Sequence, residues 1–121
     1  MYPKSDKNSL ILELIEVNLH SKEVGMKAAN LGELVQHKFP GPNGFVIKTR
    51  AYDIFLDNNN LLEHIQKTLE SIDYNDYESI KSSAIIIHNS IERNSLPRKL
   101  IEEITNNFEK MEYSLLVQNL N

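Results

Sequence analysis

Apolar residues along this chain recur mostly at helical spacing, and the breaks between the runs predict about five helices. The first helix is expected from Gly25 to about His37. The prolines and glycines at residues 40–44 then forbid regular structure. Thr49 can cap a second helix that continues through Leu56. The apolar face of the first helix would consist of Ala28, Leu31, Leu34 and Val35.

Three further helices are predicted from their starting residues. Asn60 can cap the third, with Glu63 completing a capping box, and Asp76 can cap the fourth. Pro97 favours the start of the fifth. The third helix would bury Leu61, Leu62, Ile65, Leu69 and Ile72. The fourth would bury Tyr77, Ile80, Ala84, Ile87 and Ile91, and the fifth Leu100, Ile101, Ile104, Phe108 and Met111.

Strand signals are few and short. Residues 10–17 mix β-branched residues with glutamates and predict a strand, with a short helix as the competing interpretation. Residues 45–48 predict a second strand and residues 115–117 a closing one. The sequence therefore predicts a helix-rich α+β fold with a small sheet, in a single domain that spans residues 1–121.

Composition and charge exclude several classes of function. The chain has 121 residues, a net charge of −4 and no cysteine. The acidic balance argues against nucleic-acid and anionic-membrane partners, and the absence of cysteine excludes disulfides and thiolate chemistry. The apolar run near the N-terminus is interrupted by Glu13 and Glu16, which favours neither a signal peptide nor a membrane span. A cytoplasmic location is expected.

The most informative residues for chemistry stand at the start of the first predicted helix, where Gly25 is followed by Lys27. A lysine in the first turn is unfavourable for the helix itself, because the helix N-terminus already carries a partial positive charge. The arrangement suits an anion such as phosphate, which backbone N–H groups and the ammonium could share. An ordinary solvated lysine is the alternative interpretation.

Two blocks of sequence resemble the nucleotide-binding domain of the phosphoenolpyruvate synthase and pyruvate phosphate dikinase family, which includes rifampicin phosphotransferases. Residues 24–34 read Val-Gly-Met-Lys-Ala-Ala-Asn-Leu-Gly-Glu-Leu. Residues 39–49 read Phe-Pro-Gly-Pro-Asn-Gly-Phe-Val-Ile-Lys-Thr, and residues 50–56 then read Arg-Ala-Tyr-Asp-Ile-Phe-Leu. Family members show a Val-Gly-Gly-Lys-x-Ala-Asn-Leu-Gly-Glu-Leu helix, a Pro-x-Pro-x-Gly-Phe strand entry and a Thr-x-x-Ala-Tyr segment in the same order.

The resemblance implies ATP as ligand, with Lys27 and Gly25 binding its phosphates, and magnesium only in a complete family enzyme. Two positions depart from the family pattern. Met26 replaces the second glycine, and Gln118 stands where a Val-Arg-Ser-Ser strand would carry a phosphate-binding arginine. Because glutamine is uncharged, it cannot replace the bidentate contact of an arginine, so ATP affinity is expected to be weak or absent.

No catalytic or metal-binding residue is predicted. The four histidines show no ligand spacing, and His88 is expected to be a partly buried structural residue. Tyr52 and Phe55 are expected in the core, and no nucleophile is predicted at residues 82–83. The glutamates at 102, 103, 109 and 112 are interpreted as a solvated helix face.

Two functions remain open from the sequence. The chain resembles the leading part of a dikinase-type ATP-binding domain, which implies a truncated or excised subdomain that is not competent for phosphoryl transfer alone. The alternative is a stand-alone interaction or regulatory module that keeps the fold without ATP chemistry. The expected partners are a nucleotide, the remainder of an enzyme, or a second copy paired through the strand at residues 115–117.

Overall fold

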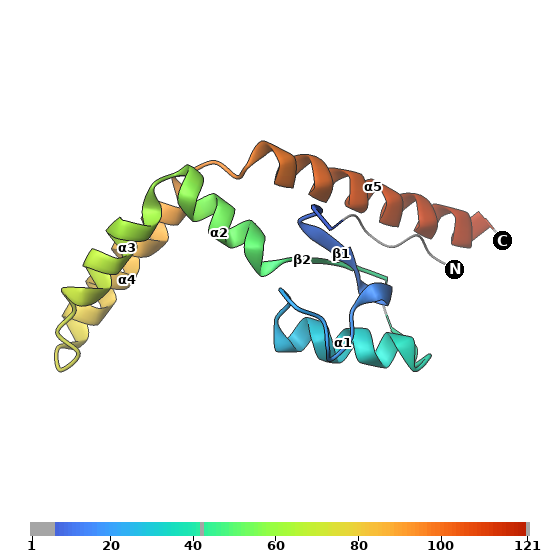
Figure 1. Ribbon diagram of the computed structural model, residues 1–121, viewed down its shortest axis with the longest axis horizontal. Helices are drawn as coiled ribbons and strands as arrows, with labels where there is room; N and C mark the ends of the chain where they lie inside the picture. The colour runs from blue at the N-terminus through green and yellow to red at the C-terminus, as the bar shows by residue number, and fades with distance from the viewer. Residues whose placement is uncertain (1–6, 42, 121) are drawn as a thin grey trace. The chain divides into compact units, whose positions relative to one another are not determined.

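The computed structural model describes residues 7–41 and 43–120, except for the side chains of residues 114, 115 and 118–120. It is a mostly helical α+β fold with five α-helices and a two-stranded antiparallel sheet among these residues (Figure 1). In chain order the elements are β1 (Ile11–Glu13), the 3-10 turn η1 (Leu14–Glu16), α1 (Met26–Gln36), β2 (Phe45–Ile47), α2 (Thr49–Asn58), α3 (Leu61–Glu70), α4 (Tyr77–Glu92) and α5 (Arg98–Leu120). The predicted fold class is confirmed.

The chain divides into two compact units. The first contains the described residues up to 52 and from 98 onward, and therefore β1, η1, α1, β2, the start of α2, and α5. The second contains residues 53–97, with the end of α2 and helices α3 and α4. Helix α2 thus begins in the first unit and ends in the second.

The sheet of the first unit pairs β1 with β2, with Leu12 opposite Val46 at its centre. Beyond the strands, the Lys48 amide donates to the Leu10 carbonyl at 2.8 Å, and the Leu14 amide donates to the Gly44 carbonyl at 2.9 Å. The predicted strand at residues 10–17 is therefore present but short. Its second half is η1, so both interpretations of this segment are partly realised.

Helix α1 buries small residues, and of the apolar face predicted for it only Ala28 and Val35 are half-buried. Ala29 and Gly32 are buried, whereas Leu31 and Leu34 are 37% and 48% exposed. The helix packs against η1, and a Cβ placed on Gly32 would lie 2.1 Å from the Val17 carbonyl oxygen. Such close approach requires glycine, because any larger residue would overlap the backbone.

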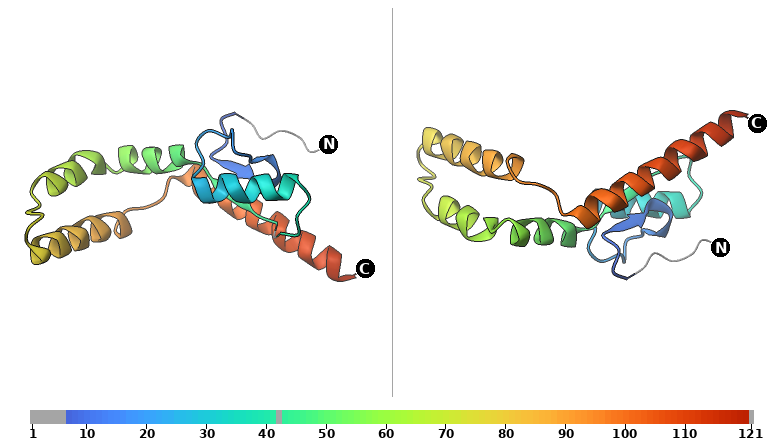
Figure 2. Two further views of the ribbon diagram at one scale, coloured as in Figure 1. Left: turned by 90° about the horizontal axis from the view of Figure 1, so that it is seen from below. Right: turned by 90° about the horizontal axis from the view of Figure 1, so that it is seen from above.

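Helix α5 lies on the opposite side of the sheet from α1 (Figures 1 and 2). Two of its side chains hold the segment that leads into β1: Glu103 Oε2 accepts from the Leu10 amide at 2.9 Å, and Lys99 Nζ donates to the Asn8 carbonyl at 2.6 Å. Glu103 is therefore a structural partner and not part of a solvated face, although Glu102, Glu109 and Glu112 are exposed as expected.

The apolar face predicted for α5 is only partly buried. Leu100 is buried, but Ile101 and Phe108 are 47% and 61% exposed. The predicted strand at residues 115–117 is wrong, because this segment continues α5. A strand-edge pairing between two copies at this segment therefore has no basis.

The second unit has a small core formed by Phe55, Leu56 and Leu61, against which Ile65 and Ile91 pack. Helices α3 and α4 lie side by side (Figure 2), and His64 Nε2 lies 3.0 Å from Ser90 Oγ between them. The apolar stripes predicted for these helices are only partly buried: Leu61 is buried, and Ile65, Ile72, Ile87 and Ile91 are half-buried. The other members are exposed, namely Leu62, Leu69, Tyr77, Ile80 and Ala84.

The two predicted helix caps of the second unit have different outcomes. Asp76 Oδ1 accepts from the Glu78 amide at 3.0 Å, so the predicted cap of α4 is confirmed. Asn60 precedes α3 in a left-handed conformation, with φ of 53°, and makes no side-chain cap hydrogen bond. The predicted capping box with Glu63 is therefore wrong, because the left-handed backbone replaces the extended conformation that a capping residue adopts.

Candidate functional site

The start of α1 places a lysine beside backbone N–H groups that have no hydrogen-bond partner among the described residues. Gly25 is the N-cap residue, and the first intrahelical hydrogen bond runs from the Ala29 amide to the Gly25 carbonyl at 3.0 Å. The backbone N–H groups of residues 26–28 precede that bond and donate no hydrogen bond within the helix. No acidic residue stands in this first turn. Lys27 is exposed and forms no ion pair among the described residues.

The two glycines of this segment are in different surroundings. Gly32 is required by its contact with Val17, whereas Gly25 has φ of −76° and no atom within 4 Å of an added Cβ. Neither backbone conformation nor packing inside this chain therefore requires glycine at position 25. Next to it, Met26 is 73% exposed and lies at the surface of the same turn.

The loop before α1 is held by α2. The Thr49 amide donates to the Glu23 carbonyl at 2.8 Å, so the starts of α1 and α2 are joined through this loop. Arg50 Nε lies 3.6 Å from Glu23 Oε1. The backbone of Glu23 has a positive φ of 63°, a conformation that residues other than glycine rarely adopt. Sequence reasoning missed Glu23 and Arg50, because neither the local spacing nor the residue types indicate a contact across 27 positions.

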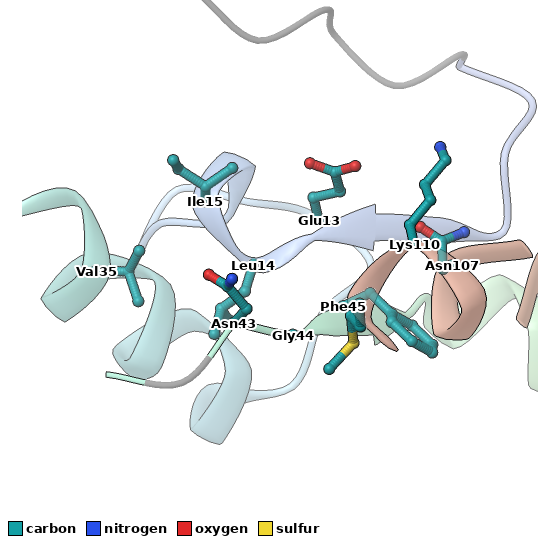
Figure 3. Close-up of a pocket in the computed structure, with 10 residues that line it drawn as sticks. Glu13, Leu14, Ile15, Val35, Asn43, Gly44, Phe45, Asn107 and Lys110 are labelled. Carbon is teal, nitrogen blue, oxygen red and sulfur yellow. The ribbon is translucent and has the colours of Figure 1, made fainter. Parts of the chain in front are cut away.

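A separate cavity of about 240 Å³ lies elsewhere in the first unit (Figure 3). Polar side chains at its edge include Glu13, Asn43 and Lys110, and Phe45 forms part of its apolar wall. Gly25 and Lys27 do not line it. The cavity and the start of α1 are therefore different places, and the sequence did not predict the cavity.

The histidines are surface residues. His88 is 69% exposed in its side chain and lies 3.1 Å from Glu92 Oε1, so the partly buried role expected for it is wrong. His37 similarly lies 3.6 Å from Glu33 Oε1. Among the described residues, no three histidine, aspartate or glutamate side chains come together as a metal site.

The remaining sequence-predicted residues are placed as follows. Phe55 is buried as expected, but Tyr52 is 51% exposed. Ser83 is buried in α4 while Ser82 is exposed. Gln118 belongs to α5 by its backbone, and its side chain lies outside the described part of the structure. No helix in the part of the chain that the structure describes is both long and apolar enough to cross a bilayer.

Comparisons with known proteins match most of the chain. Residues 21–118 match the family described as pyruvate phosphate dikinase, AMP/ATP-binding domain. A probable phosphoenolpyruvate synthase of Staphylothermus marinus is 36% identical over 81 residues, which cover 67% of this chain and 10% of the relative. The phosphoenolpyruvate synthase of Aquifex aeolicus is 32% identical over 108 residues, which cover 85% of this chain and 13% of the relative. The chain thus spans about a tenth of the length of these curated relatives.

Proposed function

The chain belongs to the pyruvate phosphate dikinase AMP/ATP-binding domain family, and we propose that it supplies the phosphate-facing part of an ATP site. In this proposal Gly25 and Lys27 bind the nucleotide phosphates. The observation that carries it is the first turn of α1, where three amides outside the helical ladder lie beside Lys27, which has no ion-pair partner among the described residues.

The electrostatics of this turn favour a bound anion. The N-terminus of α1 carries a partial positive charge, and its first turn has neither an acidic residue nor a side-chain cap hydrogen bond. A phosphate would accept from the backbone amides and from the Lys27 ammonium at once. Gly25 supports close approach, since the space that a Cβ would enter at this position is empty.

We further propose that the chain alone does not transfer phosphate. Phosphoryl transfer requires metal ions that neutralise charge on the nucleotide and an acceptor placed in line. This chain corresponds to about a tenth of a phosphoenolpyruvate synthase, so these groups would come from other parts of such an enzyme. With ATP, magnesium and pyruvate, the purified chain should show no turnover. ATP consumption that follows the protein through purification and is lost in Lys27→Gln would contradict this.

Calorimetric titration with ATP tests the binding site. Lys27→Gln should weaken binding by about tenfold or more, because a charge-assisted hydrogen bond contributes about 1.5–3 kcal/mol. Lys22→Gln is the matched control: it removes the same charge from the exposed loop before α1 and should change affinity less than about twofold, as expected for a screened surface charge.

Equal losses in both variants would indicate a diffuse charge effect and contradict a site at Lys27. If the unmodified chain binds no ATP at all, the proposed function is wrong. The better explanation is then that this chain serves as an interaction module that keeps the fold without ATP chemistry.

A further inference from the structure

Arg50 connects three segments of the first unit that are distant in sequence. It stands in the first turn of α2, and its Nη2 donates to the Lys7 and Ser9 carbonyls, each at 3.1 Å. Its Nε is buried, has no hydrogen-bond partner among the described residues, and lies 3.6 Å from Glu23 Oε1. One guanidinium group therefore faces both the segment that leads into β1 and the loop that leads into α1.

The position of this charge is not explained by helix α2 itself. A cation in the first turn of a helix is unfavourable, because it adds to the positive end of the helix dipole. The Glu23 carboxylate provides the opposite charge, and Glu23 is only two residues before Gly25. The contact therefore lies directly next to the turn that would receive phosphate.

Glu23 also has a backbone conformation that needs support. Its φ of 63° lies in the left-handed region, which is unfavourable for a residue with a Cβ. Two contacts hold it from α2: its carbonyl accepts from the Thr49 amide at 2.8 Å, and its carboxylate faces Arg50. The first turn of α2 thus contacts both the backbone carbonyl and the side-chain carboxylate of Glu23.

We propose that Arg50 is a positioning residue for the phosphate site: through Glu23 it fixes the loop that sets the direction of Gly25 and Lys27. This inference rests on the proposed function, because it requires that ATP binds next to this loop and that an ordered loop strengthens the binding. Arg50 acts through Glu23 and does not itself contact phosphate.

The experiment compares Glu23→Gln, Arg50→Gln and Arg50→Lys in the full chain, with Lys67→Gln as a control that breaks an exposed ion pair with Glu63 in the second unit. Backbone amide exchange of residues 22–26 is measured without ligand, and ATP affinity is measured by titration. Glu23→Gln is the decisive variant, since it leaves the Arg50 bonds to Lys7 and Ser9 in place.

The inference predicts faster exchange at residues 22–26 in Glu23→Gln and Arg50→Gln. ATP affinity should fall by about two- to fivefold, which is the range a partly exposed ion pair can produce. Arg50→Lys should recover most of this affinity because it keeps the charge, and the combined Glu23→Gln and Arg50→Gln variant should lose no more than either alone. Lys67→Gln should behave like the unmodified chain.

A purely structural role would give a different pattern. Glu23→Gln would then leave loop exchange and affinity unchanged, and Arg50→Lys would be as damaging as Arg50→Gln, because lysine lacks the planar fork that contacts two carbonyls. Either result overturns the inference. If the unmodified chain binds no ATP, the proposed function fails separately. The exchange of residues 22–26 then still decides whether Arg50 orders the loop.

Discussion

The two units of this molecule are stabilised in different ways. In the first, segments distant in sequence hold one another, as where Glu103 accepts from the Leu10 amide and Thr49 donates to Glu23. Its core includes Leu10 and Val17, which are 2% and 0% exposed. In the second, consecutive helices of one continuous stretch of chain pack on a small core of Phe55, Leu56 and Leu61, with Ile65 and Ile91 against it.

The difference indicates why the candidate site lies in the first unit. A phosphate site needs a loop and a helix start in a fixed geometry, and contacts between distant segments supply that restraint. Local helix pairing gives regular structure without fixing an irregular loop. The comparison can be tested by substitutions that weaken one unit or the other.

The largest effect is expected at Gly32. Gly32→Ala places a Cβ 2.1 Å from the Val17 carbonyl oxygen, so the contact between α1 and η1 must open. We expect a loss of more than about 3 kcal/mol in the free energy of unfolding, measured by urea denaturation. Gly25→Ala is the matched control, because nothing lies within 4 Å of its added Cβ, and it should lose about 1 kcal/mol or less. Equal losses would contradict the close approach at Gly32.

Phe55→Ala tests the second unit. Phe55 is 5% exposed and is the largest member of the small core, so removing it leaves a cavity and should destabilise this unit by about 3 kcal/mol. Amide exchange should become faster throughout α3 and α4. Exchange in β1 and α1 that accelerates equally would show that the two units unfold together, and would remove the distinction between them.

The smallest effect is expected at the start of α4. Asp76→Ala removes the hydrogen bond to the Glu78 amide and should cost about 1 kcal/mol, measured by thermal unfolding. Asn60→Gly is the comparison, since Asn60 makes no cap bond and has a positive φ that glycine adopts readily. It should be neutral or slightly stabilising. A larger loss from Asn60→Gly than from Asp76→Ala would contradict both assignments.

The sequence predicted those features that depend on local chemistry. Gly25, Asp76 and Pro97 correctly indicated where helices begin, because the residue preferences of a helix start act within one turn. The buried face of α1 was not predicted, since close packing selected Ala29 and Gly32 over larger apolar residues. The left-handed Asn60 similarly has no signal in residue spacing.

The candidate site could be predicted only in part from the sequence. Gly25 and Lys27 could be identified from their position at a helix start, but their contact with nucleotide stays a prediction. The contacts of Arg50 with Glu23, Lys7 and Ser9 depend on tertiary structure. The predicted strand at residues 115–117 failed because the apolar pattern is short, and α5 continues through it with compatible spacing.

The phosphate site at the start of α1 can be tested by recording backbone amide chemical shifts during parallel titrations with ATP, tripolyphosphate and adenosine. We expect ATP and tripolyphosphate to shift residues 25–30 most and adenosine not to shift them. Lys27→Gln should remove the effect while the rest of the spectrum keeps its dispersion. Shifts confined to α3, α4 and α5, or a response to adenosine alone, would contradict a phosphate site at the start of α1.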